Sequence, residues 1–242
     1  MPPNVEYTLT VNIDRTQLEI LRREDYKLCL AKRIGSESVD VIWQATEPVD
    51  KNIFRWTVDY QVFGASSFTP GALVGAETDS IPVEFGQTVV RDKNGVMQPA
   101  TGAPNNSDAF SVRNEYSPMF IGINAAHDGR KSSPSYVTQI QSDTGSETRL
   151  APREIVHLWF YPHATAGTMF VDRIPNNSLQ IDMAANNDAE VEFTASGVWV
   201  ILHRAEAIVP SEHHRDADKG IEIGREAALL DENEIVKPEG DS

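Results

Sequence analysis

Four side chains able to bind a ligand alternate along one stretch of the sequence, Glu154 to His163, which contains E-I-V-H-L-W-F-Y-P-H. Successive side chains of a β-strand point to opposite faces, so one face would carry His157, Trp159, Tyr161 and His163. An indole offers a flat apolar surface to a sugar ring, and imidazole and phenol groups offer hydrogen bonds to its hydroxyls. The stretch therefore predicts a carbohydrate-binding face.

The same residues allow two other interpretations. A strand buried on both faces would place Trp159 inside the protein and the histidines near its ends, and an aromatic face also suits a membrane interface. A metal ion shared by His157 and His163 is excluded in a regular strand. Six residues at about 3.3 Å each separate the two imidazoles by about 20 Å, whereas the ligands of one metal ion lie about 2 Å from it.

Two polar loops supply a second group of candidate ligand-binding residues. One contains Asn105 and Asn106, and the other, which we place between about residues 127 and 135, contains His127 and Asp128. Loops at the ends of a β-sandwich commonly carry binding residues. The alternative is that both loops are solvated connections between strands.

Short stretches of alternating apolar and polar residues predict the elements that hold these candidates in place. A helix over about 15 to 24 is expected after the first strand, with Asp14 as N-cap, Gln17 completing a capping box, and Leu18 and Leu21 inward. An Asn-Gly turn at 94–95 predicts a hairpin. The main expected strands are Val5–Ile13, Tyr26–Ile34, Val39–Gln44, Phe54–Phe63, Met119–Asn124, Gly167–Val171, Leu179–Met183, Ala189–Thr194 and Val198–His203.

About eleven or twelve short strands, punctuated by Gly, Pro and Asn, predict an all-β fold, specifically an antiparallel β-sandwich. We expect this domain to span residues 1–205. From 206 to 242 the sequence becomes strongly acidic, and we expect a C-terminal extension that contains at most a short helix.

Composition excludes several classes of function. The chain has 36 acidic and 21 basic residues and a net charge of −15, which argues against binding to nucleic acid or to anionic membranes. The single cysteine, Cys29, excludes an intrachain disulfide and suits a reducing compartment. No segment has the apolar length of a transmembrane helix or the features of a signal peptide. We therefore expect a cytoplasmic protein.

Sequence motifs for catalysis are absent: we find no P-loop, G-x-G-x-x-G, G-x-S-x-G or H-E-x-x-H pattern. We therefore expect a non-enzymatic protein without a cofactor or metal ion. The preferred hypothesis is a lectin-like protein whose partner is a glycan or glycoconjugate. The alternatives are a pore-forming, membrane-active β-sandwich toxin and a self-assembling structural protein, and a homo-oligomer is compatible with all three.

Overall fold

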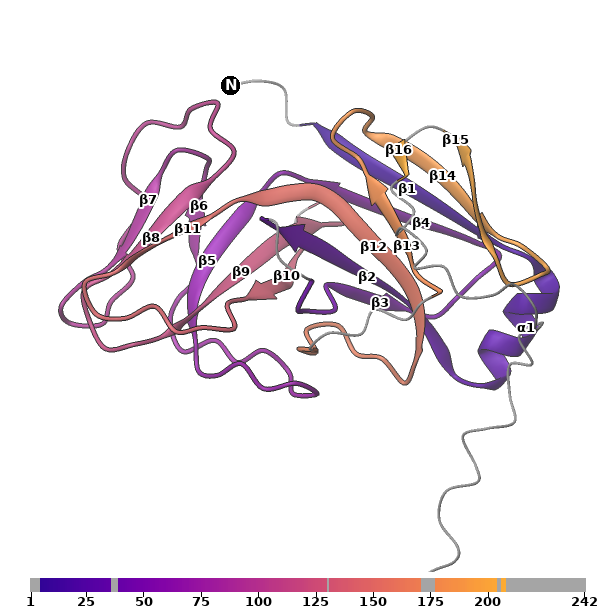
Figure 1. The fold of residues 1–242 in the computed structure, drawn as a ribbon, viewed down its shortest axis with the longest axis horizontal. Coiled ribbons are helices and arrows are strands. Elements are labelled where there is room, and N and C mark those ends of the chain that lie inside the picture. The colour runs from indigo at the N-terminus through magenta and orange to yellow at the C-terminus, as the bar shows by residue number, and fades with distance from the viewer. Residues whose placement is uncertain (1–4, 36–38, 130, 171–176, 204–205, 208–242) are drawn as a thin grey trace, which may run out of the picture. The chain divides into compact units, whose positions relative to one another are not determined.

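The computed structural model describes residues 5–35, 39–129, 131–170, 177–203 and 206–207 (Figure 1). Strands account for most of this part of the chain, and one helix follows the first strand. The elements are β1 (Glu6–Ile13), α1 (Arg15–Arg23), β2 (Tyr26–Ile34), β3 (Gln44–Thr46), β4 (Lys51–Thr57), β5 (Tyr60–Ala65), β6 (Ile81–Val83), β7 (Thr88–Arg91), β8 (Phe110–Asn114), β9 (Phe120–His127), β10 (Lys131–Val137), β11 (Glu147–Leu150), β12 (Pro152–Pro162), β13 (Leu179–Asp182), β14 (Asp188–Phe193), β15 (Trp199–His203) and β16 (Glu206–Ala207).

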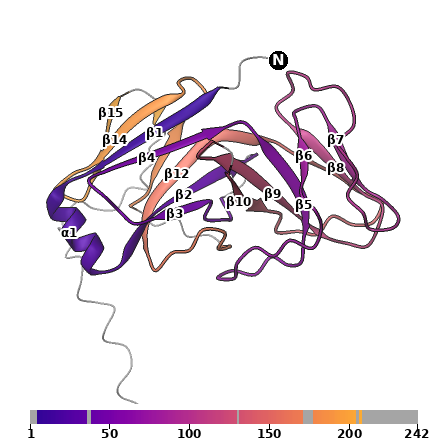
Figure 2. The same cartoon turned by 180° about the vertical axis from the view of Figure 1, so that it is seen from behind.

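The strands form four sheets, with the orders β15-β14-β1-β4, β10-β9-β5-β6, β11-β8-β7 and β16-β13-β12-β2-β3. Figure 2 shows the same sheets from behind. This arrangement confirms the predicted all-β, sandwich-like class. The expectation that every pairing is antiparallel was wrong, because β1 pairs with β14 in parallel and β7 pairs with β8 in parallel.

Alternation of side chains along β1 and β2 places their apolar residues in one main core. Leu9 and Val11 of β1 and Leu28 and Leu30 of β2 have no exposed surface and belong to the same hydrophobic cluster. Burying each of these side chains stabilises the fold by about 1.5–3 kcal/mol. The bounds of β2 are those that the sequence predicted.

Helix α1 begins and packs largely as expected. The Asp14 carboxylate accepts a hydrogen bond of 2.8 Å from the backbone N–H of Thr16, and Leu18 and Leu21 are buried. The predicted capping box was wrong, since Gln17 donates instead to the carbonyl of Ala195 at 2.8 Å. That contact ties the helix to the turn between β14 and β15.

Three strand predictions were wrong, because the pairing partners change or are lost along each segment. The expected strand Phe54–Phe63 is interrupted after Thr57, and its two halves, β4 and β5, belong to different sheets. In the described parts of the expected strands Val39–Gln44 and Gly167–Val171, which leave out Val171, the pairing is limited to isolated bridges such as the one between Val41 and Met169, and β3 begins only at Gln44.

The expected loop from 127 to 135 is also largely a strand. β10 starts at Lys131 and pairs with β9, so His127 lies opposite Lys131 in a hairpin. In contrast, the Asn-Gly turn is confirmed. The N–H of Gly95 (φ +83°) donates to the Asp92 carbonyl at 2.9 Å, and Arg91 bridges to Met97.

Within the described residues, no helix has the length and apolar character needed to cross a membrane. The predicted acidic extension spans residues 206–242, of which 208–242 lie outside the described residues. Residues 206–207 form β16 and pair with β13.

Candidate functional site

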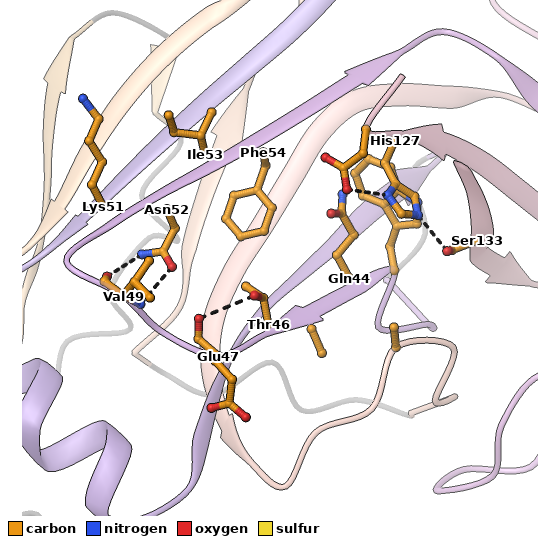
Figure 3. Close-up of a pocket in the computed structure, with 14 residues that line it drawn as sticks. Gln44, Thr46, Glu47, Val49, Lys51, Asn52, Ile53, Phe54, His127 and Ser133 are labelled. Carbon is orange, nitrogen blue, oxygen red and sulfur yellow. Dashed lines mark hydrogen bonds and ion pairs between the residues drawn. The ribbon is translucent and has the colours of Figure 1, made fainter. Parts of the chain in front are cut away.

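A pocket of about 550 Å³ opens between β3, the start of β4 and the β9–β10 hairpin (Figure 3). Polar side chains from all three segments line it, together with the rings of Trp43 and Phe54. Its lining residues are Trp43, Gln44, Ala45, Thr46, Glu47, Val49, Lys51, Asn52, Ile53, Phe54, His127, Asp128, Ser133 and Ala166.

A chain of three hydrogen-bonded side chains lies at one side of the pocket. The Asp128 carboxylate is 3.2 Å from Nδ1 of His127, and Nε2 of the same imidazole is 2.8 Å from the Ser133 hydroxyl (Figure 3). The imidazole is 12% exposed and stands edge-on to Trp43 at 5.9 Å. Packing and hydrogen bonds therefore fix the orientation of the ring.

The β9–β10 hairpin brings these three residues together. Asp128 has a left-handed backbone (φ +46°), and its N–H donates to the carbonyl of Arg55 on β4 at 3.0 Å. This turn folds the Asp128 side chain back toward the imidazole that precedes it. Ser133 lies opposite Ala125 in the ladder, so its hydroxyl reaches His127 from the returning strand.

Gln44 contributes a hydrogen-bond donor that no described residue accepts from. Its Nε2 atom is buried and has no hydrogen-bond partner among the described residues. A buried donor without a partner costs about 1–3 kcal/mol of stability. Gln44 lines the pocket, but its Nε2 atom is covered, so a ligand accepts a bond from it only when the side chain turns toward the pocket.

The rim of the pocket carries charges of both signs. Glu47 is exposed and accepts a hydrogen bond from Lys27, and Lys51 is exposed at the start of β4. Asn52 already uses its side-chain amide within the protein. Its oxygen accepts a hydrogen bond from the Val49 N–H, and its nitrogen donates to the carbonyls of Val49 (Figure 3) and Val11. Asn52 therefore holds the turn before β4.

On another side of Trp43 lies a closed group of polar residues, which we call the Glu154 cluster: Lys32, Trp56, Tyr60 and Glu154. The Glu154 carboxylate accepts hydrogen bonds from Lys32 Nζ at 3.0 Å, Trp56 Nε1 at 2.8 Å and Tyr60 OH at 2.7 Å. The Lys32 side chain has no exposed surface, and its ammonium lies 5.2 Å from the Trp43 ring centre. Cation–π attraction to the surrounding rings adds to the ion pair.

Burial and charge pairing compete in setting the pKa values of the Glu154 cluster. Burial lowers the pKa of Lys32, and the carboxylate of Glu154 opposes this change. Burial alone would raise the pKa of Glu154, but Lys32 and the donors Tyr60 and Trp56 outweigh it and hold that pKa below its usual value. Burial and the same carboxylate raise the pKa of Tyr60 well above 10. The cluster is thus an ion pair enclosed by its partners.

Trp159 does not form a ligand-binding face. Its side chain is 2% exposed and packs with Cys29 and Ile42, and its ring meets Phe170 edge-on at 5.6 Å. The neighbouring residues Val156 and Leu158 are buried in the main core. Around Trp159, strand β12 is therefore buried on both faces, which was the structural alternative for this stretch, and the prediction of an exposed indole was wrong.

The other three candidates from β12 lie in three different environments. Tyr161 is 49% exposed. His157 is partly buried between β2 and β13, where burial and the charge of Arg33 lower its pKa to about 4. His163 follows the strand with φ +53°, and its Nδ1 is 2.5 Å from the Asp25 carboxylate. These side chains do not form one surface.

The loop candidates separate as well. Asn105 and Asn106 are exposed, and the Asn105 carboxamide accepts a hydrogen bond from the Ser107 N–H at 2.8 Å and packs against Gly86. They do not line the pocket, whereas His127 and Asp128 do. Two of the eight predicted ligand-binding residues are therefore brought together at this site.

Sequence reasoning missed Gln44 and Ser133 in the pocket, and Lys32 and Glu154 in the core. One signal was present: Lys32 continues the inward positions of Leu28 and Leu30 along the predicted strand. A lysine at an inward position requires a buried partner. No local pattern identifies Gln44 or Ser133.

Among the described residues, no group of three or more His, Cys, Asp and Glu side chains is arranged to hold a metal ion. Comparison of the chain with protein-family models, curated proteins and solved structures found no match.

Proposed function

We propose that this protein binds a polar, hydroxyl-rich ligand of the carbohydrate class in the pocket between β3, β4 and the β9–β10 hairpin. The supporting observation is the buried amide donor of Gln44, which lacks a partner among the described residues and lines a pocket of about 550 Å³. This volume falls within the range of about 300–1,000 Å³ typical of small-molecule sites.

The groups around Gln44 suit hydroxyls. Glu47 supplies acceptors, Lys51 supplies donors, and the imidazole–hydroxyl pair of His127 and Ser133 supplies both. Phe54 supplies an apolar wall for ring C–H groups (Figure 3). In this proposal, the residues of the pocket replace Trp159 as the ligand-binding residues.

A glycan array probed with the fluorescently labelled protein tests the proposal. We compare the wild type with Gln44→Met, which removes the amide and keeps the side chain's length, and with Tyr161→Ala as the matched control on β12. Binding should weaken at least about tenfold in Gln44→Met, since a ligand group loses its donor. Tyr161→Ala should bind as the wild type does. A blank array, or binding that survives in Gln44→Met and disappears in Tyr161→Ala, contradicts the proposal.

One observation favours self-assembly as a second candidate. β15 is the last strand of its sheet among the described residues, and Val198, Val200 and Leu202 beside or within it are 54%, 42% and 51% exposed. An apolar edge strand is a template for pairing with another chain. Light scattering should then show an oligomer that Val200→Lys dissociates, whereas a monomeric wild type would exclude this candidate. Dye release from liposomes would indicate the membrane-active alternative instead.

A further inference from the structure

We propose that the pocket is also an esterase site, in which Ser133 is the nucleophile, His127 the general base and Asp128 the residue that positions the imidazole. Two distances carry the proposal: 2.8 Å from the Ser133 hydroxyl to His127 Nε2, and 3.2 Å from His127 Nδ1 to the Asp128 carboxylate. A nucleophile and its base act together when their heavy atoms lie about 2.6–3.2 Å apart. Such a triad is recognised by geometry and roles, whatever the order of its residues in the sequence.

The surroundings of Ser133 differ from those of an ordinary structural serine. Ser135, two residues along β10, is fully buried, and its hydroxyl donates to the backbone carbonyl of Ile123 at 3.2 Å. Ser133 is partly exposed, lines the pocket, and bonds to the imidazole of His127. A substrate entering the pocket therefore reaches the Ser133 hydroxyl.

The position of Asp128 favours the tautomer that the reaction needs. A carboxylate oxygen accepts a hydrogen bond from Nδ1–H, and in that tautomer Nε2 is free to accept the Ser133 proton. Edge-on packing against Trp43 keeps the ring in this orientation. Asp128 acts through His127 and is a positioning residue.

The reaction needs no co-reactant besides water. Ser133 Oγ attacks the ester carbonyl carbon while His127 Nε2 accepts the hydroxyl proton. The bond from that carbon to the alcohol oxygen then breaks, and His127 returns the proton to the leaving alcohol. Water attacks the acyl-serine with His127 again accepting a proton, and the acid departs as Ser133 regains its hydrogen.

Gln44 supplies the further element of such a site. The carbonyl oxygen becomes negative in the tetrahedral intermediate, and side-chain amides are among the donors that stabilise it. The Gln44 Nε2 donor is buried and lacks a partner among the described residues, and a turn of this side chain, which lines the same pocket as Ser133, exposes the donor to a substrate. We assign this donor to the carbonyl oxygen of the substrate.

The substrate class is an ester of a polar alcohol, such as an O-acylated sugar, and this identification of the alcohol rests on the proposed carbohydrate binding. The esterase chemistry itself rests on the three side chains and is tested without a sugar. It departs from the expectation of a non-enzymatic protein, which was based on local sequence motifs.

The test uses the full chain with a fluorophosphonate probe and with p-nitrophenyl acetate. We expect mass spectrometry to find the label on Ser133, and His127→Gln to lose labelling. Ser133→Ala should lower kcat/KM by at least about 1,000-fold. Asp128→Asn should lower kcat by at least about 100-fold with little change in KM, and it should alter the dependence of kcat on pH. A merely structural role of Asp128 would leave that pH dependence unchanged.

Ser132→Ala is the matched control, because Ser132 is exposed and adjacent in β10 but does not line the pocket. It should keep full labelling and hydrolysis, and circular dichroism should show every variant folded. Absence of labelling in the folded wild type, or hydrolysis unchanged in Ser133→Ala, overturns the esterase. Glycan binding without labelling refutes the esterase alone, and labelling of Ser133 with a blank array refutes carbohydrate binding alone.

Discussion

Trp43 lies between two sets of polar side chains, the Glu154 cluster and the lining of the pocket. They differ in whether their buried hydrogen-bonding atoms have partners among the described residues. In the Glu154 cluster, the carboxylate accepts bonds from Lys32, Trp56 and Tyr60. In the pocket, the Gln44 Nε2 donor has no partner among the described residues, and the Ser133 hydroxyl, bonded to His127, belongs to a residue that lines the pocket. Both sets are built from residues far apart in the sequence. The described residues satisfy the Glu154 carboxylate, whereas they leave the Gln44 donor without an acceptor.

This difference separates a group that stabilises the fold from the group that we propose binds a ligand. Buried polar groups that satisfy one another hold a unique core arrangement, and the loss of one partner is costly. A donor left open in a pocket lowers stability and becomes useful only when a ligand accepts its bond. Substitutions in the two groups should therefore change stability in opposite directions.

The largest effect is expected in the Glu154 cluster. Glu154→Gln leaves the Lys32 ammonium buried without its counter-charge and should lower the free energy of unfolding by about 3–5 kcal/mol. Chemical denaturation measures this change. Arg149→Gln is the control, since its ion pair with Asp108 is exposed and should contribute at most about 1 kcal/mol. Equal small losses in both variants would show that burial adds nothing to the Glu154 pair.

A second effect concerns His157, a partly buried base that lies near the positive charge of Arg33. The pKa of His157 falls from 6.5 to about 4 on folding, so the folded state keeps the imidazole neutral while the unfolded chain takes up a proton. Above pH 6.5 the neutral imidazole of His157 therefore costs no stability. As the pH falls from 6.5 toward 4, the free energy of unfolding decreases, by about 3 kcal/mol in all. Glu154, whose pKa lies below its ordinary value of 4.5, changes the stability only at lower pH, where its contribution is lost as the carboxylate takes up a proton.

Denaturation curves between pH 7 and pH 4 check this prediction for the wild type and for His157→Gln. The variant should lose most of the pH dependence in this window. A wild type whose stability is constant from pH 7 to pH 4, or a His157→Gln variant with the same slope as the wild type, would contradict it.

The third effect has the opposite sign. Gln44→Met replaces an amide whose donor lacks a partner with an apolar chain of similar length, and should raise the free energy of unfolding by about 1 kcal/mol. The same variant should bind ligand more weakly, as described above. Loss of stability in Gln44→Met would mean that the amide is satisfied in the folded protein, and the contrast with the Glu154 cluster would fail.

The smallest effect is expected at Tyr161, which is 49% exposed on β12. Tyr161→Ala should change the free energy of unfolding by no more than about 0.5 kcal/mol. Thermal unfolding measures this change, and a loss above about 2 kcal/mol would indicate a packing role that the exposure of the side chain does not suggest.

Much of the local structure could be predicted because it depends on near neighbours. The alternation in Tyr26–Ile34 gave the bounds of β2, the Asp14 side chain marked the start of α1, and the Asn-Gly pair marked a turn. The inward side of each of these elements follows from the same periodicity. Lys32 could have been recognised as a buried lysine on this basis alone.

The candidate site was harder to predict, since it depends on which strands become neighbours. Alternation along β12 assigned Trp159 to one face correctly, but whether solvent or Phe170 covers that face is set by packing. His127 and Asp128 were identified as loop residues, whereas Ser133 joined them only because β10 returns beside β9.

The sequence by itself determined the all-β class, the helix near the N-terminus and the inward side of strands such as β1 and β2, because these follow from periodicity and capping within a few residues. Only the tertiary structure decided that Lys32 meets Glu154, that Trp159 is core and that Gln44 shares a pocket with His127 and Ser133. These contacts join distant segments, and the apolar pattern of a strand does not specify which partner will cover it.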